Sequence, residues 1–193
     1  MKRKDIILQT ALQMFNESNT QAVTTNHIAK EMDISPGNLH YHYKNREEII
    51  RILYTQMREK MTLSVDELPK NIRELNVHQK ILIEVQWEYK FFFREILFLL
   101  SRDVKLKKLY IEDNLAHRAR IKIVMQHFIA NGELEIMYDH TLEYLVDAIL
   151  MAWQFYTSHL QTLGRNIDVK AAQEAVEFTN NAMRPFLTKK AFL

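Results

Sequence analysis

Residues 35–45 read SPGNLHYHYKN, a short stretch with the signals of a capped helix. Ser35 can accept a hydrogen bond from the first turn, and Pro36 suits the first helical position because no N–H is needed there. On a helix from 36 to 43, Leu39 and Tyr43 share one face and can point to a core. The opposite face carries small residues first and polar-tipped rings after them: Pro36, Gly37, Asn38, His40, Tyr41 and His42. This outward face is available to contact another molecule.

The residues before this helix predict a second short helix. Thr24 can cap a helix over 25–32 that turns Ile28 inward, and a link of about three residues, including Asp33, then leads to Ser35. Asp is tolerated in such a turn without much strain. Two short helices joined in this way form a helix-turn-helix. Amphipathic helices over 3–18 and from 45 to about 63 brace it, and Asn19 is expected to end the first in a left-handed conformation.

The outward face has the chemistry of a nucleic-acid contact. Small residues at a helix start let the backbone approach a surface closely, and rings with N–H or O–H tips suit phosphate oxygens and thymine methyls. The second helix of a helix-turn-helix enters the DNA major groove with its N-terminus first. The charge is only mildly basic: the net charge is +2, and residues 1–60 hold 9 Lys and Arg against 7 Asp and Glu.

Four segments, taken in order, resemble the TetR family of bacterial transcriptional regulators. They are the first helix up to Phe15, VTTNHIA at 23–29, ISPGNLHYHYKN at 34–45 and REEII at 46–50. The resemblance implies an all-α fold with a helix-turn-helix domain at 1–47, a linking helix over 46–63, and a larger effector-binding and dimerisation domain at 64–193. The family most often has tyrosine in place of His40 and glycine in place of Asp33.

The resemblance also implies which residues meet double-stranded operator DNA. Arg3 and Lys4 are candidates for the adjacent backbone or minor groove. The principal candidates lie at the start of the second helix and along the third helix and its end: Thr25, Asn26, Pro36, Gly37, Asn38, His40, Tyr41, His42, Lys44 and Arg46.

The remainder of the chain also predicts helices. Only three glycines and three prolines occur in 193 residues, at positions that punctuate long helical segments. Asn76 and Gln79 form a capping-box pattern for a helix to about Leu100. Further helices are expected from about 103 to 110, over 112–131 up to Gly132, over 139–163 up to Gly164, and over 168–187.

The last two predicted helices point to a homodimer. Helices 139–163 and 168–187 are long, carry apolar stripes and are joined by a short loop, so their outer faces can form a four-helix bundle with a second copy. The alternative is that the stripes only cover the monomer's own core. A lone helix-turn-helix reads few base pairs, which favours the dimer.

Aromatic residues of the second part predict a pocket for a small-molecule effector. The candidate wall residues are Trp87, Phe91, Phe128, Trp153 and Tyr156. Ordinary core packing is the alternative for each of them. Such a wall suggests an apolar or a cationic ligand. The sequence does not name the effector.

Other functional classes have little support in the residues. With no cysteine, disulfides and thiolate metal sites are excluded, which fits a reducing cytoplasm. The most apolar stretch, residues 89–100, is too short and too charged to span a bilayer. No metal-binding spacing, cofactor motif or catalytic constellation is visible. We expect a cytoplasmic repressor that an effector releases from a palindromic operator; the alternatives are a protein-binding helical adaptor and, with no residue to support it, a helical-bundle enzyme.

Overall fold

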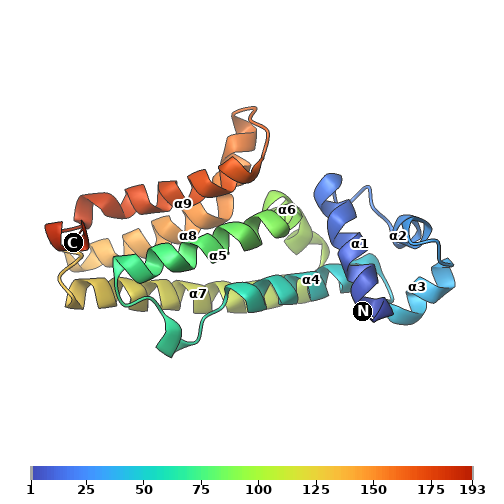
Figure 1. The fold of residues 1–193 in the computed structure, drawn as a ribbon, viewed down its shortest axis with the longest axis horizontal. Helices are drawn as coiled ribbons and strands as arrows, with labels where there is room; N and C mark the ends of the chain where they lie inside the picture. The colour runs from blue at the N-terminus through green and yellow to red at the C-terminus, as the bar shows by residue number, and fades with distance from the viewer. Residues whose placement is uncertain (1, 193) are drawn as a thin grey trace. The chain divides into compact units, whose positions relative to one another are not determined.

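The structure, a computed structural model, describes residues 2–192 and is all-α, as predicted. These residues form nine α-helices and three short 3₁₀ turns, and the only β-type pairing among them is an isolated bridge between Leu134 and Leu187. The chain divides into two compact units, whose helices are labelled in Figure 1. Unit 1 comprises the chain up to Lys60 together with Tyr89–Lys107, and unit 2 comprises Met61–Glu88 together with the chain from Lys108 onward.

Unit 1 contains the N-terminal helices and a later segment of the chain. Its helices are α1 (Arg3–Glu17), α2 (Thr25–Glu31), α3 (Pro36–His42), α4 (Arg46–Met61) up to Lys60, α6 (Lys90–Arg102) and the first residues of α7 (Val104–Ala130). The fully buried side chains of its core come from all these helices: Ile7, Ala11, Phe15, Ile28, Leu39, Ile49, Leu53, Phe91, Phe92 and Leu106.

Helix α6 is an integral part of this core. The rings of Phe15 in α1 and Phe91 in α6 are 5.4 Å apart, and Phe92 stacks on Tyr54 of α4 at 5.0 Å. The backbone N–H of Phe91 also donates to the side-chain oxygen of Asn16 at 3.1 Å. Residues 89–107 thus pack with the helix-turn-helix, whereas the sequence led us to place everything after residue 63 in one second domain.

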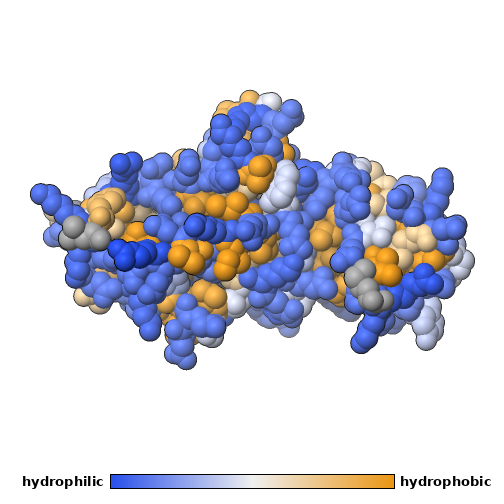
Figure 2. All heavy atoms as spheres, viewed as in Figure 1, coloured by the Kyte–Doolittle hydropathy of each residue, from blue (hydrophilic) through white to orange (hydrophobic). Residues whose placement is uncertain are grey.

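Unit 2 is built from α5 (Ile72–Glu88), the rest of α7, α8 (Asp139–Thr162) and α9 (Val169–Met183). As predicted, α8 and α9 form a hairpin, and Gly132 and Gly164 take left-handed conformations with φ of 72° and 75°. The core is a cluster of apolar side chains: Leu68, Val124, Met125, Phe128, Leu134, Leu145, Val146 and Met183. Figure 2 shows further apolar atoms at the surface over α5, α8 and α9.

The prediction of one helix from about 77 to 100 is wrong. The helix begins earlier, at Ile72, because Asn71 accepts the N–H of Glu74 at 2.9 Å and Ile72 and Leu75 pack on the core cluster. It ends at Glu88, and α6 starts at Lys90. Phe91, Phe92 and Phe93 lie in the first turn of α6, and all three are buried in unit 1.

Three smaller expectations are also corrected. The helices expected to Tyr110 and over 112–131 are one continuous helix, α7, since no glycine or proline interrupts it. Helix α4 ends at Met61, not near residue 63. Asn19 does not end α1 in a left-handed conformation; instead its side chain accepts the N–H of Ala22 at 2.7 Å.

No helix within residues 2–192 has both the length and the apolar character needed to cross a bilayer.

Candidate nucleic-acid interface and cavity of unit 2

The turn between α2 and α3 has the geometry that the sequence predicts. The N–H of Ile34 reaches back to the carbonyl of Ala29 at 2.9 Å, and that of Asp33 to Lys30 at 3.1 Å. This pair of bonds closes a helix with one left-handed residue, which is Asp33 with φ of 52°. Ser35 then starts α3 by accepting the N–H of Asn38 at 3.2 Å.

One face of α3 is anchored in the core of unit 1. Leu39 is fully buried and Tyr43, directly after the helix, is almost so. The hydroxyl of Tyr43 donates to the carbonyl of Lys4 at 3.2 Å, which ties the end of α3 to the start of α1. Burial raises the pKa of Tyr43, and the nearby carboxylates of Asp5 and Glu48 raise it further. These contacts fix which residues of α3 point outward.

The outward face of α3 is exposed from its first residue. Pro36, Gly37, Asn38 and His40 are exposed, and Tyr41 has 86% of its surface accessible. A Cβ placed on Gly37 would meet nothing closer than 4.0 Å within the protein, so the fold does not require glycine there. The bare backbone at this position instead suits close approach of an external surface.

The other residues predicted to contact DNA differ in their exposure and in their hydrogen bonds. Asn26 at the start of α2 and Lys44 after α3 are exposed, and Thr25 is half-buried. The ring Nδ1 of His40 lies 3.2 Å from the carbonyl of Lys44, to which its N–H donates. His42 is half-buried, and its Nδ1 has no hydrogen-bond partner among the described residues.

Arg46 is engaged inside unit 1. Its guanidinium donates to the carbonyl of Thr20 at 2.6 Å and pairs with Glu47 at 3.1 Å. Thr20 in turn binds Glu95 of α6, whose carboxylate also pairs with Arg94 at 3.0 Å. The structure therefore gives Arg46 a role in holding the α1–α2 loop, in addition to the phosphate contact predicted from the sequence.

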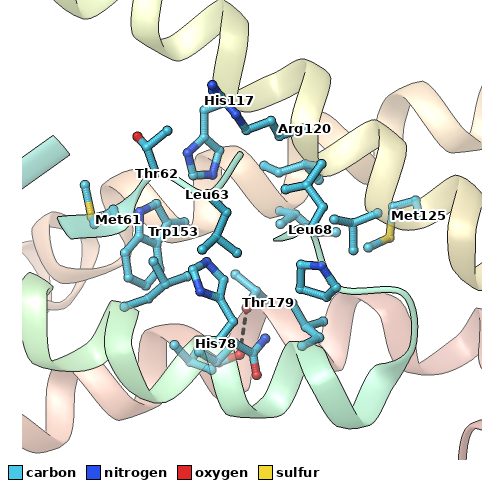
Figure 3. Close-up of a pocket in the computed structure, with 18 residues that line it drawn as sticks. Met61, Thr62, Leu63, Leu68, His78, His117, Arg120, Met125, Trp153 and Thr179 are labelled. Atoms are coloured by element: carbon cyan, nitrogen blue, oxygen red, sulfur yellow. Dashed lines mark hydrogen bonds between the residues drawn. The ribbon is translucent and has the colours of Figure 1, made fainter. Parts of the chain in front are cut away.

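Unit 2 contains a partly open cavity of about 110 Å³. It lies between α5, α7, α8 and α9 and the segment after α4, and most of its wall is aliphatic, with methionines and Trp153. Figure 3 shows the rings of His117 and His78 entering it from opposite sides, from α7 and α5 respectively. Arg120 lies one turn along α7 from His117 and also lines the cavity.

Of the five predicted effector contacts, Trp153 lines this cavity. Phe128 is fully buried in the core cluster of unit 2, and Tyr156 packs on Phe178 with ring centres 5.1 Å apart. Phe91 belongs to the core of unit 1, and Trp87 lies half-buried in α5 outside the cavity wall. The sequence analysis did not identify His78, His117 and Arg120 as cavity residues. The three-residue spacing of His117 and Arg120 shows that they share one face of a helix, but no local signal shows what packs against that face.

One face of α3 is anchored in the core of unit 1, and the opposite face is exposed. This helix-turn-helix is combined with a helical unit that has a cavity, an arrangement that defines a DNA-binding regulator. Residues 7–52 match the family described as bacterial regulatory proteins, tetR family, and residues 53–192 match that described as bacterial transcriptional repressor. The chain therefore belongs to the TetR family of bacterial transcriptional regulators, which confirms the resemblance found in the sequence.

Individual relatives agree with this assignment. The chain is 26% identical over 174 residues to IcaR, the negative transcriptional regulator of the biofilm operon icaADBC of Staphylococcus epidermidis, covering 83% of this chain and 87% of that protein. It is 28% identical over 93 residues to the regulator QacR of Staphylococcus aureus, covering 46% and 50%. A TetR-family regulator from Marinobacter aquaeolei shares the fold, with a TM-score of 0.88 at 24% identity over 98% of this chain and 93% of that one.

Proposed function

We propose that the protein is a homodimeric cytoplasmic repressor that reads a palindromic operator with two copies of α3 and is released by a small molecule bound in unit 2. The observation that carries the DNA-reading part is the outward face of α3, where Gly37 has no side chain and no packing reason to lack one. Pro36, Asn38, His40 and Tyr41 would contact base edges and adjacent phosphates. Thr25, Asn26 and Lys44 would hold the flanking backbone.

The dimer would form through α8 and α9. Tyr144 and Met151 of α8 are 70% and 64% exposed, and Phe178 of α9 is 52% exposed. Tyr144, Ala148 and Met151 follow each other at spacings of four and three residues, so they share one face of α8. A second copy would cover this apolar face. Met151→Arg should therefore yield monomers in sedimentation, with helicity unchanged; a variant that stays dimeric would place the interface elsewhere.

Release by a ligand requires a path from unit 2 to unit 1. The chain passes between the units within α4, between α5 and α6, and within α7. A ligand that favours one arrangement of α5 and α7 would therefore act on the covalent connections to α6 and α4. This is a population shift, in which the ligand stabilises a form with lower affinity for DNA.

Selection of bound duplexes from a random DNA pool tests the DNA-reading part. We expect enrichment of a palindromic sequence that the protein binds at least about a thousandfold more tightly than random DNA, with half-sites about one helical turn apart. Gly37→Glu should abolish this binding, because it places a bulky anion on the contact face. Gln161→Glu, which adds the same charge at an exposed position at the end of α8, is the matched control.

The same selection separates this function from its alternative, a helical adaptor that binds protein. An adaptor has no reason to discriminate between DNA sequences. Absence of enrichment, also after unfolding and refolding to remove any bound ligand, would favour the adaptor. Equal binding by wild type and Gly37→Glu would place the DNA surface outside α3.

A further inference from the structure

The cavity of unit 2 has polar groups that the protein leaves unused. The polar wall residue Gln79 is already paired, since its amide exchanges two hydrogen bonds with Asn180 of α9, at 2.7 and 3.1 Å. Thr179 donates its hydroxyl to the carbonyl of Val176 at 2.7 Å. By contrast, the side chains of His78, His117 and Arg120 make no hydrogen bond or ion pair with any described residue.

Arg120 is the charged member of this set. Its Nε is shielded from solvent and has no acceptor within residues 2–192. A buried N–H of a charged group without an acceptor is unfavourable, and a carboxylate is the acceptor that matches a guanidinium best. None of the residues that line the cavity is Asp or Glu. The wall thus has one positive charge, no negative charge and an otherwise mostly apolar surface.

We propose that the cavity binds a small apolar organic anion, with its carboxylate on Arg120, an imidazole N–H of His117 or His78 as second donor, and its hydrocarbon part against Trp153 and the aliphatic wall. The anion proposal rests on the proposed function in one respect only, because it takes the bound anion to be the effector. The aromatic residues in the sequence suggested an apolar or cationic ligand; the structure favours the anion, because the wall has no carboxylate to balance a cation.

The volume of the cavity favours a ligand whose buried part is a single ring or a short chain. An apolar cavity of about 150 Å³ is enough for benzene. At about 110 Å³, this cavity is somewhat smaller, so binding of a benzoate-like acid or of an acid of about six carbons requires movement of the flexible methionines in its wall.

The protonation of the histidines agrees with this ligand. Burial, together with the smaller effect of repulsion from the adjacent Arg120 and His78, lowers the pKa of His117 to about 4. Burial also lowers the pKa of His78. Both rings are therefore neutral at pH 7, so each offers an N–H donor without adding a charge that would repel Arg120.

Calorimetric titration of the full-length protein with matched compounds tests the proposal. The probes are benzoate and hexanoate, the neutral benzyl alcohol and hexanol, and the cations benzylamine and hexylamine. We expect the carboxylates to bind at least about tenfold more tightly than the alcohols, and the amines not to bind. Arg120→Gln should lower carboxylate affinity about tenfold or more and leave alcohol binding unchanged. Lys108→Gln, which removes an exposed positive charge from the same helix, should bind all probes like wild type.

Each of three results would overturn the anion proposal: alcohols or amines that bind as well as carboxylates, carboxylate binding that survives Arg120→Gln, or no carboxylate binding below about 10 mM. Circular dichroism of Arg120→Gln verifies that the variant is folded. Because the titration contains no DNA, its failure leaves the regulator proposal intact. If carboxylates bind but do not alter operator affinity, the ligand class stands and the release mechanism fails.

Discussion

Thr20 donates two hydrogen bonds to the carboxylate of Glu95, from its backbone N–H at 3.0 Å and from its hydroxyl at 2.6 Å. Thr20 lies in the loop that precedes the helix-turn-helix, and Glu95 lies in α6, far along the sequence. Arg46 completes the arrangement by donating to the carbonyl of Thr20 at 2.6 Å. These bonds join α6 to the DNA-reading helices, in addition to the packing of Phe91 and Phe92.

Glu95→Gln should lower the free energy of unfolding by about 1–3 kcal/mol, because a nearly buried charged acceptor is replaced by a neutral amide that cannot accept the same set of bonds. Urea unfolding followed by circular dichroism measures this. Glu31→Gln, at an exposed position of α2, serves as control and should change stability little. Equal stability of the two variants would show that the Thr20 contacts contribute nothing net.

Asp33→Gly should stabilise the protein by up to about 1 kcal/mol, because Asp33 occupies the left-handed region at φ of 52° and glycine adopts it without a Cβ penalty. Asp33→Val should destabilise it, since a β-branched residue is unfavourable there. Thermal unfolding of the three proteins should rank them Gly, Asp, Val. If Val is as stable as Asp, the turn does not impose this conformation.

Gly37→Ala should separate stability from DNA binding. The added Cβ meets open space and helical glycine is unfavourable, so the variant should be more stable by up to about 1 kcal/mol. Operator affinity should fall at the same time, as measured by fluorescence anisotropy. Gly132→Ala is the contrasting variant: its φ of 72° makes alanine strained, so stability should fall while operator affinity is retained. Unchanged DNA affinity in Gly37→Ala would argue against close approach at this residue.

Unit 2 should lose stability in mild acid through His117. Burial, with Arg120 and His78 nearby, lowers the pKa of His117 to about 4. The unfolded chain, in which histidine titrates near about 6.5, therefore binds more protons between these two values. The resulting contribution to stability is complete above about pH 6.5 and is lost, by up to about 3 kcal/mol, as the pH falls to about 4.

His117→Gln should flatten this part of the stability profile, measured by urea unfolding at a series of pH values. The control is a substitution of the exposed His159 by Gln, which should give the same dependence of stability on pH as wild type. A profile for His117→Gln that parallels wild type between pH 4 and 6.5 would contradict the assignment to His117.

Local signals in the sequence determined the helix-turn-helix. Thr24 and Ser35 as caps, Pro36 at the first helical position and Asp33 in the turn all act within four residues of themselves, and each appears as predicted. The glycines that end α7 and α8 and the helix cap at Asp168 are also local signals that appear as predicted. Short-range hydrogen bonds and allowed backbone angles decide these features, so the sequence is sufficient to find them.

The tertiary structure decided where the aromatic residues go and which polar groups meet. A run such as Phe91 to Phe93 is compatible with a pocket or a core, and only packing against Phe15 and Tyr54 places two of these rings in unit 1. His78 and Arg120 are 42 residues apart in the sequence and meet at one cavity because α5 and α7 both line it. Helical periodicity gives the direction of a side chain around its own helix, but the partner helix is chosen by the burial of the whole chain.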